Sequence, residues 1–273
     1  MTFTRLILVS AAAVLALSEL SLPGSRGLAA SSQETAARET LRIRVTDFPR
    51  PVHAAVRQVE GQFGRPVTYE DAPYVYSGDI VDVTAQVSRS GDMSKRILGR
   101  RPGSIDVSYV PQKASIDAQV EDVLRAVVEQ ASAADLAGDF SVRPVAGGFH
   151  VVPTARKGKN GVKEPFTSVL DARITIPETE DGILEVLALL GQAISRSTET
   201  LVAPGVVPVG GGFSRARVTV VARDEPARDV LWRALQSVSP DLSWAVLCEV
   251  GEKSTCYISI HPVRKGYVHP AFK

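Results

Sequence analysis

Apolar residues recur along the first part of the chain with the periods of a strand and a helix in turn. Residues 41–45 (LRIRV) alternate as a strand does, and the apolar residues between positions 52 and 63 share one face of a helix. Gly64 is suited to end that helix, and residues 65–70 (RPVTYE) resume an extended pattern. The predicted unit is strand, helix, strand.

A second unit follows in the same half. Residues 104–110 alternate as a strand, Ser115 is placed to cap a helix, and the apolar residues between 120 and 131 form the buried face of that helix. The extended runs at 140–145 and 149–154 are separated by a glycine-rich connection, which is typical of a β-hairpin.

The second half of the chain repeats this order. Its predicted elements are a strand at 172–176, a helix with apolar residues at 183–194, an extended run at 198–204, a strand at 215–223, a helix with apolar residues at 230–238, and a hairpin of 242–250 and 255–263. Thr179 and Pro226 are placed to begin the two helices, and Trp232 and Trp244 are expected in the core. The pattern predicts an α+β fold of two tandem βαβ-βαββ modules, whose amphipathic helices cover one face of small sheets and leave the other face in water.

Composition and alignment of the two halves divide the chain into segments. We expect a first module at 41–154 with an insertion at 71–103, a linker at 155–171, a second module at 172–263 and a tail at 264–273. The linker carries several cations and no apolar period, so we interpret it as a solvated connection. Its alternative role is a docking patch for a phosphate or an acidic partner.

This order resembles the secretin and TonB short N-terminal domain, in two copies. The resemblance rests on DFPRPVHAAVRQVEGQFGRPVTYE, SIDVSYV, VEDVLRAVVEQ and FSVRPVAGGFHVVPT in the first half, and on GILEVLALLGQAIS and PARDVLWRALQSV in the second. It implies a periplasmic module that contacts other proteins near an outer-membrane channel or receptor. No pore or barrel sequence follows the second copy, so we expect neither a secretin nor a receptor.

The first thirty residues have the pattern of a secretory signal peptide. Arg5 precedes an apolar run that Glu19 interrupts, and small residues lie at Ala29 and Ala30, after which cleavage is expected. The alternative is an uncleaved anchor, but a membrane span needs about 20 apolar residues. We therefore expect a periplasmic or secreted protein without a membrane span after cleavage.

The composition is that of a globular protein with little net charge. The chain has 273 residues, with 31 lysines and arginines against 30 aspartates and glutamates. This balance provides no field that would concentrate a nucleic acid, so we expect no nucleic-acid partner.

Two cysteines, Cys248 and Cys256, lie on the two arms of the final predicted hairpin. In an oxidising compartment, an even number of cysteines is interpreted first as a disulfide, and facing strand residues can meet its geometry. The alternatives are two free buried thiols and a redox or metal role.

Local motifs for catalysis or for a cofactor are absent from the sequence. Its four histidines are scattered, and no phosphate loop, nucleophile elbow or zinc motif occurs. We expect no catalytic, metal-binding or cofactor-binding residues, and no enzyme activity.

The insertion holds the candidate partner-binding residues Tyr69, Tyr74, Tyr76 and Asp79, because tyrosines provide contact area at a small entropic cost. Its cationic end, formed by Lys95, Arg96, Arg100 and Arg101, would complement an acidic partner. The alternative is an edge strand at 79–87 that covers its own sheet, with the tyrosines packed beneath it.

Together these features predict a non-catalytic protein-binding or adaptor protein of the cell envelope, with a protein partner or a second copy of itself. The alternatives are a secreted hydrolase whose site no local motif reveals, and a structural subunit that self-associates through sheet edges.

Overall fold

The computed structural model confirms the predicted α+β class. It describes residues 40–87, 96–112, 115–136, 138–208, 210, 212–251 and 255–266. The predicted signal peptide at 1–30 and residues 267–273 of the predicted tail lie outside the described residues. Within the described residues, no helix is both long enough and apolar enough to cross a membrane.

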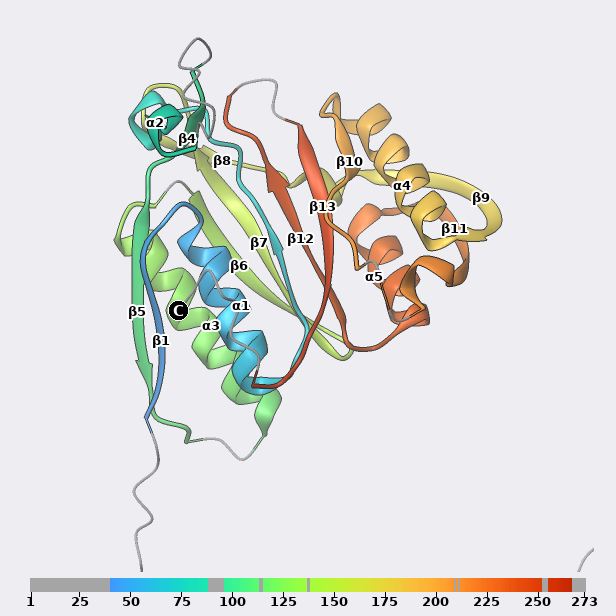
Figure 1. Ribbon diagram of the computed structural model, residues 1–273, viewed down its shortest axis with the longest axis horizontal. Coiled ribbons are helices and arrows are strands. Elements are labelled where there is room, and N and C mark those ends of the chain that lie inside the picture. The colour runs from blue at the N-terminus through green and yellow to red at the C-terminus, as the bar shows by residue number, and fades with distance from the viewer. Residues whose placement is uncertain are drawn as a thin grey trace, which may run out of the picture. The chain divides into compact units, whose positions relative to one another are not determined.

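The first half contains the predicted strands and helices in their predicted order. They are β1 (Leu41–Phe48), α1 (Pro51–Phe63), β2 (Val67–Glu70), β5 (Gly103–Tyr109), α3 (Ile116–Ala133), β6 (Gly138–Val145) and β7 (Gly148–Lys157). Pro51 begins α1, where a missing N–H costs nothing, and Gly64 ends it with a left-handed φ of 65°. Helices α1 and α3 lie between the antiparallel pair β1–β5 and a sheet that contains β2, β7 and β6 (Figure 1).

The second half repeats both the order and the pairing. Its elements are β9 (Arg173–Gly182), α4 (Ile183–Thr198), β10 (Val202–Pro204), β11 (Arg217–Pro226), α5 (Ala227–Val238), β12 (Leu242–Cys248) and β13 (Cys256–Pro262). Strands β9 and β11 pair as β1 and β5 do, and the parallel pair β10–β13 with antiparallel β12 corresponds to β2–β7 with β6.

The two halves share one sheet, which the sequence did not indicate. Its order is β10-β13-β12-β2-β7-β6, because β12 pairs in parallel with β2 (Figure 1). Small two-stranded sheets are present as expected, but the centre of the shared sheet has neither face in water, since all four residues of β2 are buried. Val67 and Tyr69 belong to the core beneath α1, whereas Glu70 points to the other face and contacts Arg228 of α5.

Each half nevertheless keeps its own hydrophobic core. One cluster gathers apolar residues of α1, α3 and the strands around them, together with Ala245 from β12. The other gathers those of α4, α5 and their strands, including Trp232 and Trp244, which are 6% and 0% exposed. The expectation that both tryptophans lie in the core is confirmed.

Buried polar side chains join the halves across this shared sheet. Arg228 donates to both carboxylate oxygens of Glu70, from Nε at 2.5 Å and from Nη2 at 2.9 Å, and the Ser168 hydroxyl donates to the same carboxylate. On the other face, His261 of β13 lies 3.0 Å from Glu60 of α1. Because each pair takes one partner from each half, neither half has a complete set of partners alone.

Two predicted helix caps differ from the structure. Ser115 precedes α3, but its side chain makes no capping hydrogen bond. Thr179 lies inside β9, and α4 begins at Ile183 after Gly182. Strand β9 continues to Gly182 because it pairs with β11 along its whole length, and this pairing overrides the local capping signal.

The region at 155–171, expected to be a solvated linker, contains ordered structure. Strand β7 continues to Lys157, β8 (Lys163–Pro165) pairs with it, and the 3-10 turn η2 (Val169–Asp171) buries Leu170 completely. The composition suggested a connection because some of the carboxylates that pair with its cations lie in other segments, such as Asp139 for Lys163.

The insertion forms a small hairpin apart from the shared sheet. It contains the 3-10 turn η1 (Ser77–Asp79), β3 (Ile80–Asp82), the one-turn helix α2 (Thr84–Val87) and β4 (Leu98–Arg100). Within the part of the chain that the structure describes, strands β3 and β4 pair with each other and with no other strand. The alternative of an edge strand over 79–87 is therefore wrong, since the strand ends at Asp82 and does not join the shared sheet.

Candidate functional site

A buried carboxylate anchors the insertion where β2 and β12 end. Asp71 follows β2 directly, and its side chain is fully buried. Its Oδ2 accepts hydrogen bonds from Arg50 Nε at 2.9 Å, from Arg100 Nη1 at 2.7 Å and from the Cys248 backbone N–H at 2.9 Å. Its Oδ1 accepts one from the Tyr69 hydroxyl at 2.8 Å. One carboxylate thus joins α1, β2, β4 and β12.

Two guanidinium groups share this single carboxylate. Both Arg50 and Arg100 also donate to the Cys248 carbonyl oxygen, and the Arg100 guanidinium lies 4.1 Å from the centre of the Tyr74 ring. Burial alone would raise the pKa of Asp71, but the two arginines outweigh it and hold this pKa below its usual value. Among the described residues, Asp71 is the carboxylate that pairs with both guanidinium groups, and the Cys248 carbonyl oxygen and the Tyr74 ring add weaker attraction.

A groove of about 800 Å³ adjoins this anchor. We name it the β4 groove; the residues that define it are Pro49, Arg50, Val83, Gln86, Arg96, Ile97, Leu98, Gly99, Arg100, Cys248, Glu249 and Val250. Ile97 and Leu98 are large apolar side chains at its rim, exposed at 38% and 48%. An exposed apolar rim beside a buried, hydrogen-bonded base is typical of a surface that contacts another molecule.

The disulfide Cys248–Cys256 holds the wall of the groove opposite β4. The two residues face each other in the β12–β13 register, and their sulfur atoms lie 2.01 Å apart. The predicted pairing is therefore confirmed in the structure, and neither thiol is free. Because Cys248 also carries the backbone groups bound by Asp71, Arg50 and Arg100, the covalent link and the ion pairs fix the same residue.

The predicted tyrosines are separated by the structure. Tyr69 is 2% exposed in the core of the first half, so it offers no surface to a partner. Tyr74 packs under Arg100, where burial raises its pKa to about 12, and its carbonyl accepts the Gly251 N–H. The interpretation of these two tyrosines as packed residues is the one that their burial supports.

Tyr76 and Asp79 lie beside the end of β7. The Lys157 ammonium lies 3.5 Å from Asp79 Oδ1 and 5.8 Å from the centre of the Tyr76 ring. Asp79 and Tyr74 line a second cavity of about 500 Å³ together with Arg101 and Asp135. Both residues are half-buried, as Tyr74 is.

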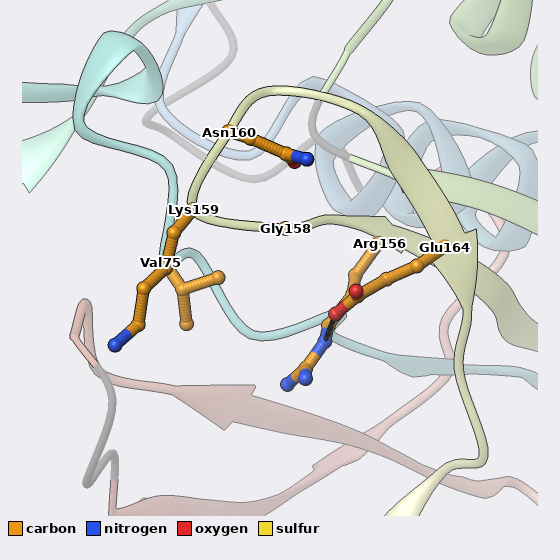
Figure 2. Close-up of a pocket in the computed structure, with 6 residues that line it drawn as sticks. All are labelled: Val75, Arg156, Gly158, Lys159, Asn160 and Glu164. Atoms are coloured by element: carbon orange, nitrogen blue, oxygen red, sulfur yellow. Dashed lines mark hydrogen bonds and ion pairs between the residues drawn. The ribbon is translucent and has the colours of Figure 1, made fainter.

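Basic residues at the end of β7 and directly after it line the pocket of Figure 2, which contains Arg156, Lys159 and Glu164. Figure 2 shows the Arg156 guanidinium against the Glu164 carboxylate, with Nε at 2.9 Å from Oε1. Lys157 pairs with Asp135 and Lys163 with Asp139 in the same way. These pairs neutralise most of the run, so the alternative of a phosphate-docking patch loses its charge basis.

Among the described residues, no three histidine, cysteine, aspartate or glutamate side chains are grouped so that they could hold a metal ion. His150 is buried and His53 is half-buried, and desolvation lowers the pKa of each to about 3. His269 lies outside the described residues.

The groove depends on residues that sequence reasoning did not select. Arg50 directly precedes a helix-starting proline, and Ile97 and Leu98 belong to no apolar period, so neither pattern indicates a site. Arg100 was expected to face a partner, yet it is 4% exposed, because its guanidinium binds Asp71 and the Cys248 carbonyl inside the protein. That two arginines share one carboxylate is visible only in the structure, where β4, α1 and β12 come together. Lys95 lies outside the described residues.

Comparison with protein-family models, with curated proteins and with solved structures gives no match for this chain.

Proposed function

We propose that this chain is an exported, non-catalytic protein-binding or adaptor protein of the cell envelope, built from two modules of the secretin and TonB short N-terminal type. The observation that carries the proposal is the β4 groove, whose rim is apolar and exposed while its base is held by the Asp71 ion pairs. A rigid base lowers the entropy lost when a partner binds, so the groove is suited to recognition.

Two further features support an exported location. The N-terminal residues have the pattern of a secretory signal, and the Cys248–Cys256 disulfide is compatible with an oxidising compartment outside the cytoplasm. The resemblance is supported by the repeated pairing pattern, in which each half has a two-stranded antiparallel sheet and contributes the corresponding three strands to the shared sheet.

The test is affinity capture from envelope extracts with residues 31–273 as bait, followed by a binary binding measurement with each purified candidate. The expected result is a protein that binds saturably in isothermal titration calorimetry. A chain that binds no purified candidate, or that hydrolyses envelope substrates in a panel assay, contradicts the proposal. Analytical ultracentrifugation of the bait alone shows whether the partner is a second copy.

A further inference from the structure

Side chains close the edges of the two-stranded sheet β1–β5. The Gln58 amide donates to the Arg44 carbonyl at 2.7 Å and accepts the Arg44 N–H at 3.0 Å, at the outer edge of β1. On β5, the Asp106 N–H donates to the Gln130 side chain at 2.9 Å. These contacts occupy backbone groups that an added strand would use, so they disfavour strand addition at both edges.

The shared sheet ends in β10 on one side and in β6 on the other. At the β10 end, the Val202 N–H donates to the Ser195 hydroxyl at 2.8 Å, and Pro204 has no N–H to offer. A satisfied N–H and a proline are devices that protect an edge from another strand. This end of the shared sheet is therefore closed.

The ladder between β6 and β7 shows that the β6 end is open. The Phe149 N–H donates to the Pro66 carbonyl, away from β6, so Phe149 and its register partner Pro144 are not bonded to each other. By the alternation of an antiparallel ladder, the backbone groups of Val142 and Phe140 also point away from β7. Within the described residues they have no hydrogen-bond partner. The open stretch is 140–142, and it ends at Pro144, which has no N–H.

The side chains of this stretch leave surface uncovered on both faces of the sheet. Phe140 and Val142 pack against the rim of the first core and are half-buried. Asp139 and Arg143 alternate with them along the strand, and their side chains are 32% and 46% exposed. An added strand would therefore meet apolar groups on one face and charged groups on the other.

The sequence around Ser141 is complementary to itself when a second copy runs antiparallel. With a two-fold axis at Ser141, Phe140 of each copy lies opposite Val142 of the other, and Asp139 lies opposite Arg143. A pair of an aromatic and a β-branched residue and a pair of opposite charges both stabilise neighbouring strands. The open edge of β6 thus matches another β6.

Asp139 can accept this second contact. Its hydrogen bonds with Ser132 and Lys163 both use Oδ1, which leaves Oδ2 for a guanidinium from another copy. The ion-pair cluster around it consists of three aspartates and two lysines: Asp79, Asp135, Asp139, Lys157 and Lys163. The cluster therefore has one net negative charge, which favours an approaching arginine.

From these observations we propose that β6 is a dimerisation edge, at which two copies of this chain pair antiparallel about a two-fold axis at Ser141. Phe140 of each copy exchanges main-chain hydrogen bonds with Val142 of the other, and the two shared sheets become one continuous sheet. Both copies use the same edge, so the contact closes on itself and forms a dimer rather than a fibre. The inference goes beyond the proposed function and uses a surface other than the β4 groove.

The first experiment is analytical ultracentrifugation of residues 31–273 over a concentration series, in which we expect a monomer–dimer equilibrium without larger species. Val142→Pro removes an outward N–H without breaking a bond to β7, so it should raise the dissociation constant of the dimer at least ten-fold. Val142→Thr keeps the N–H and the branched shape and should dimerise as the parent does. A parent that is monomeric at every concentration, or equal dissociation constants for the two variants, overturns the inference.

The second experiment places a cysteine on the two-fold axis and does not depend on the proline variant. Ser141 faces its own copy in a non-hydrogen-bonded pair, where the Cα atoms lie about 4.5 Å apart and a disulfide can form. We expect Ser141→Cys to give a covalent dimer on mild oxidation with copper phenanthroline, seen on a non-reducing gel. The control Ser108→Cys, at an exposed serine of β5, should stay monomeric. Equal cross-linking of the two variants contradicts the inference.

The inference and the proposed function can fail separately. A monomeric chain that still binds a captured protein overturns the β6 dimer and leaves the proposed function standing. A dimer that Val142→Pro dissociates, formed by a chain that binds no purified candidate, supports the β6 dimer and contradicts the proposed function.

Discussion

At the scale of single residues, Asp71 is a carboxylate whose stability inside the protein depends on its neighbours. It is fully buried, it accepts four hydrogen bonds, and it is the only carboxylate within ion-pair distance of Arg50 and Arg100 among the described residues. Removing one partner of a buried ion pair leaves an uncompensated buried charge, which costs more than the pair itself contributes.

We therefore expect Asp71→Asn to lower the free energy of unfolding by about 3–5 kcal/mol at pH 7, measured by urea denaturation. The control is Asp106→Asn, which removes a carboxylate from an exposed pair with Arg42 and should change the free energy of unfolding far less than Asp71→Asn does. Equal losses in the two variants would show that the buried ion pairs of Asp71 stabilise the fold no more than an exposed ion pair does.

His150 makes stability depend on pH in a predictable direction. Burial chiefly, with the charges of Arg228 and Arg143, lowers its pKa to about 3 from an ordinary value of 6.5. The unfolded chain therefore binds this proton near pH 6.5 and the folded chain near pH 3, so protonation favours unfolding as the pH falls between them. Above pH 6.5 this group has no effect on the free energy of unfolding.

Urea denaturation at pH 7, 6 and 5 tests this difference with His150→Gln, whose amide retains a polar group opposite the Thr68 hydroxyl. Between pH 6 and pH 5, the free energy of unfolding of the parent should fall by about 1 kcal/mol more than that of the variant. One titrating group can change this free energy by at most about 1.4 kcal/mol per pH unit. Parallel pH profiles for the two proteins would contradict the assignment.

At the scale of elements, the β12–β13 hairpin depends on its disulfide. The bond closes a short loop between Cys248 and Cys256, which are separated by 8 positions. By the chain-entropy argument, closing such a loop stabilises the fold by about 2–3 kcal/mol. We expect Cys248→Ser/Cys256→Ser to lose this amount in urea denaturation, and mass spectrometry of the parent to find neither thiol alkylated without a reductant.

The glutamines on α1 and α3 should protect the β1–β5 pair. Gln58→Ala removes two hydrogen bonds to Arg44 and should cost about 1–2 kcal/mol. The double variant Gln58→Ala/Gln130→Ala should also associate at high concentration, as seen by light scattering, because both edges become available. Glu129→Ala, an exposed change on α3, serves as the control.

Element types were predictable because their signals are local. The apolar face of α1, the left-handed Gly64 and the alternation of β5 all lie within a few residues of each other. The start of α4 was not predictable from Thr179, because the position of that start depends on β11, some forty residues away in the chain. Likewise, nothing near Arg100 shows that its guanidinium is buried against Asp71, 29 positions earlier in the chain.

At the scale of the whole molecule, the two halves meet along the β2–β12 pairing and the buried side chains beside it, which we call the seam. This seam should make the two halves unfold together. Strands β2 and β12 lie next to each other at its centre, and Glu70 and Arg228 are buried there at 0% and 4% exposure. We expect one calorimetric transition whose calorimetric and van't Hoff enthalpies agree. Two separate transitions would show that each core is stable without the other.

Arg228→Met tests the seam directly. It leaves Glu70 buried without its cation, so we expect a loss of about 3–5 kcal/mol in urea denaturation. The matched variant Arg233→Met changes an exposed arginine on the same helix and should cost about 1 kcal/mol or less. The sequence could not indicate this pairing, since Glu70 and Arg228 are 158 positions apart and each lies in a different repeat.

The pairing of β2 with β12 has a consequence for how the protein is made. Tyr69 pairs with Ala245, far along the sequence, so β2 cannot complete its pairing until nearly the whole chain has entered the compartment in which it folds. Until then, one side of β2 stays unpaired. During that interval the first half presents an apolar template, so a holding chaperone should matter more for this chain than for one whose repeats close separately.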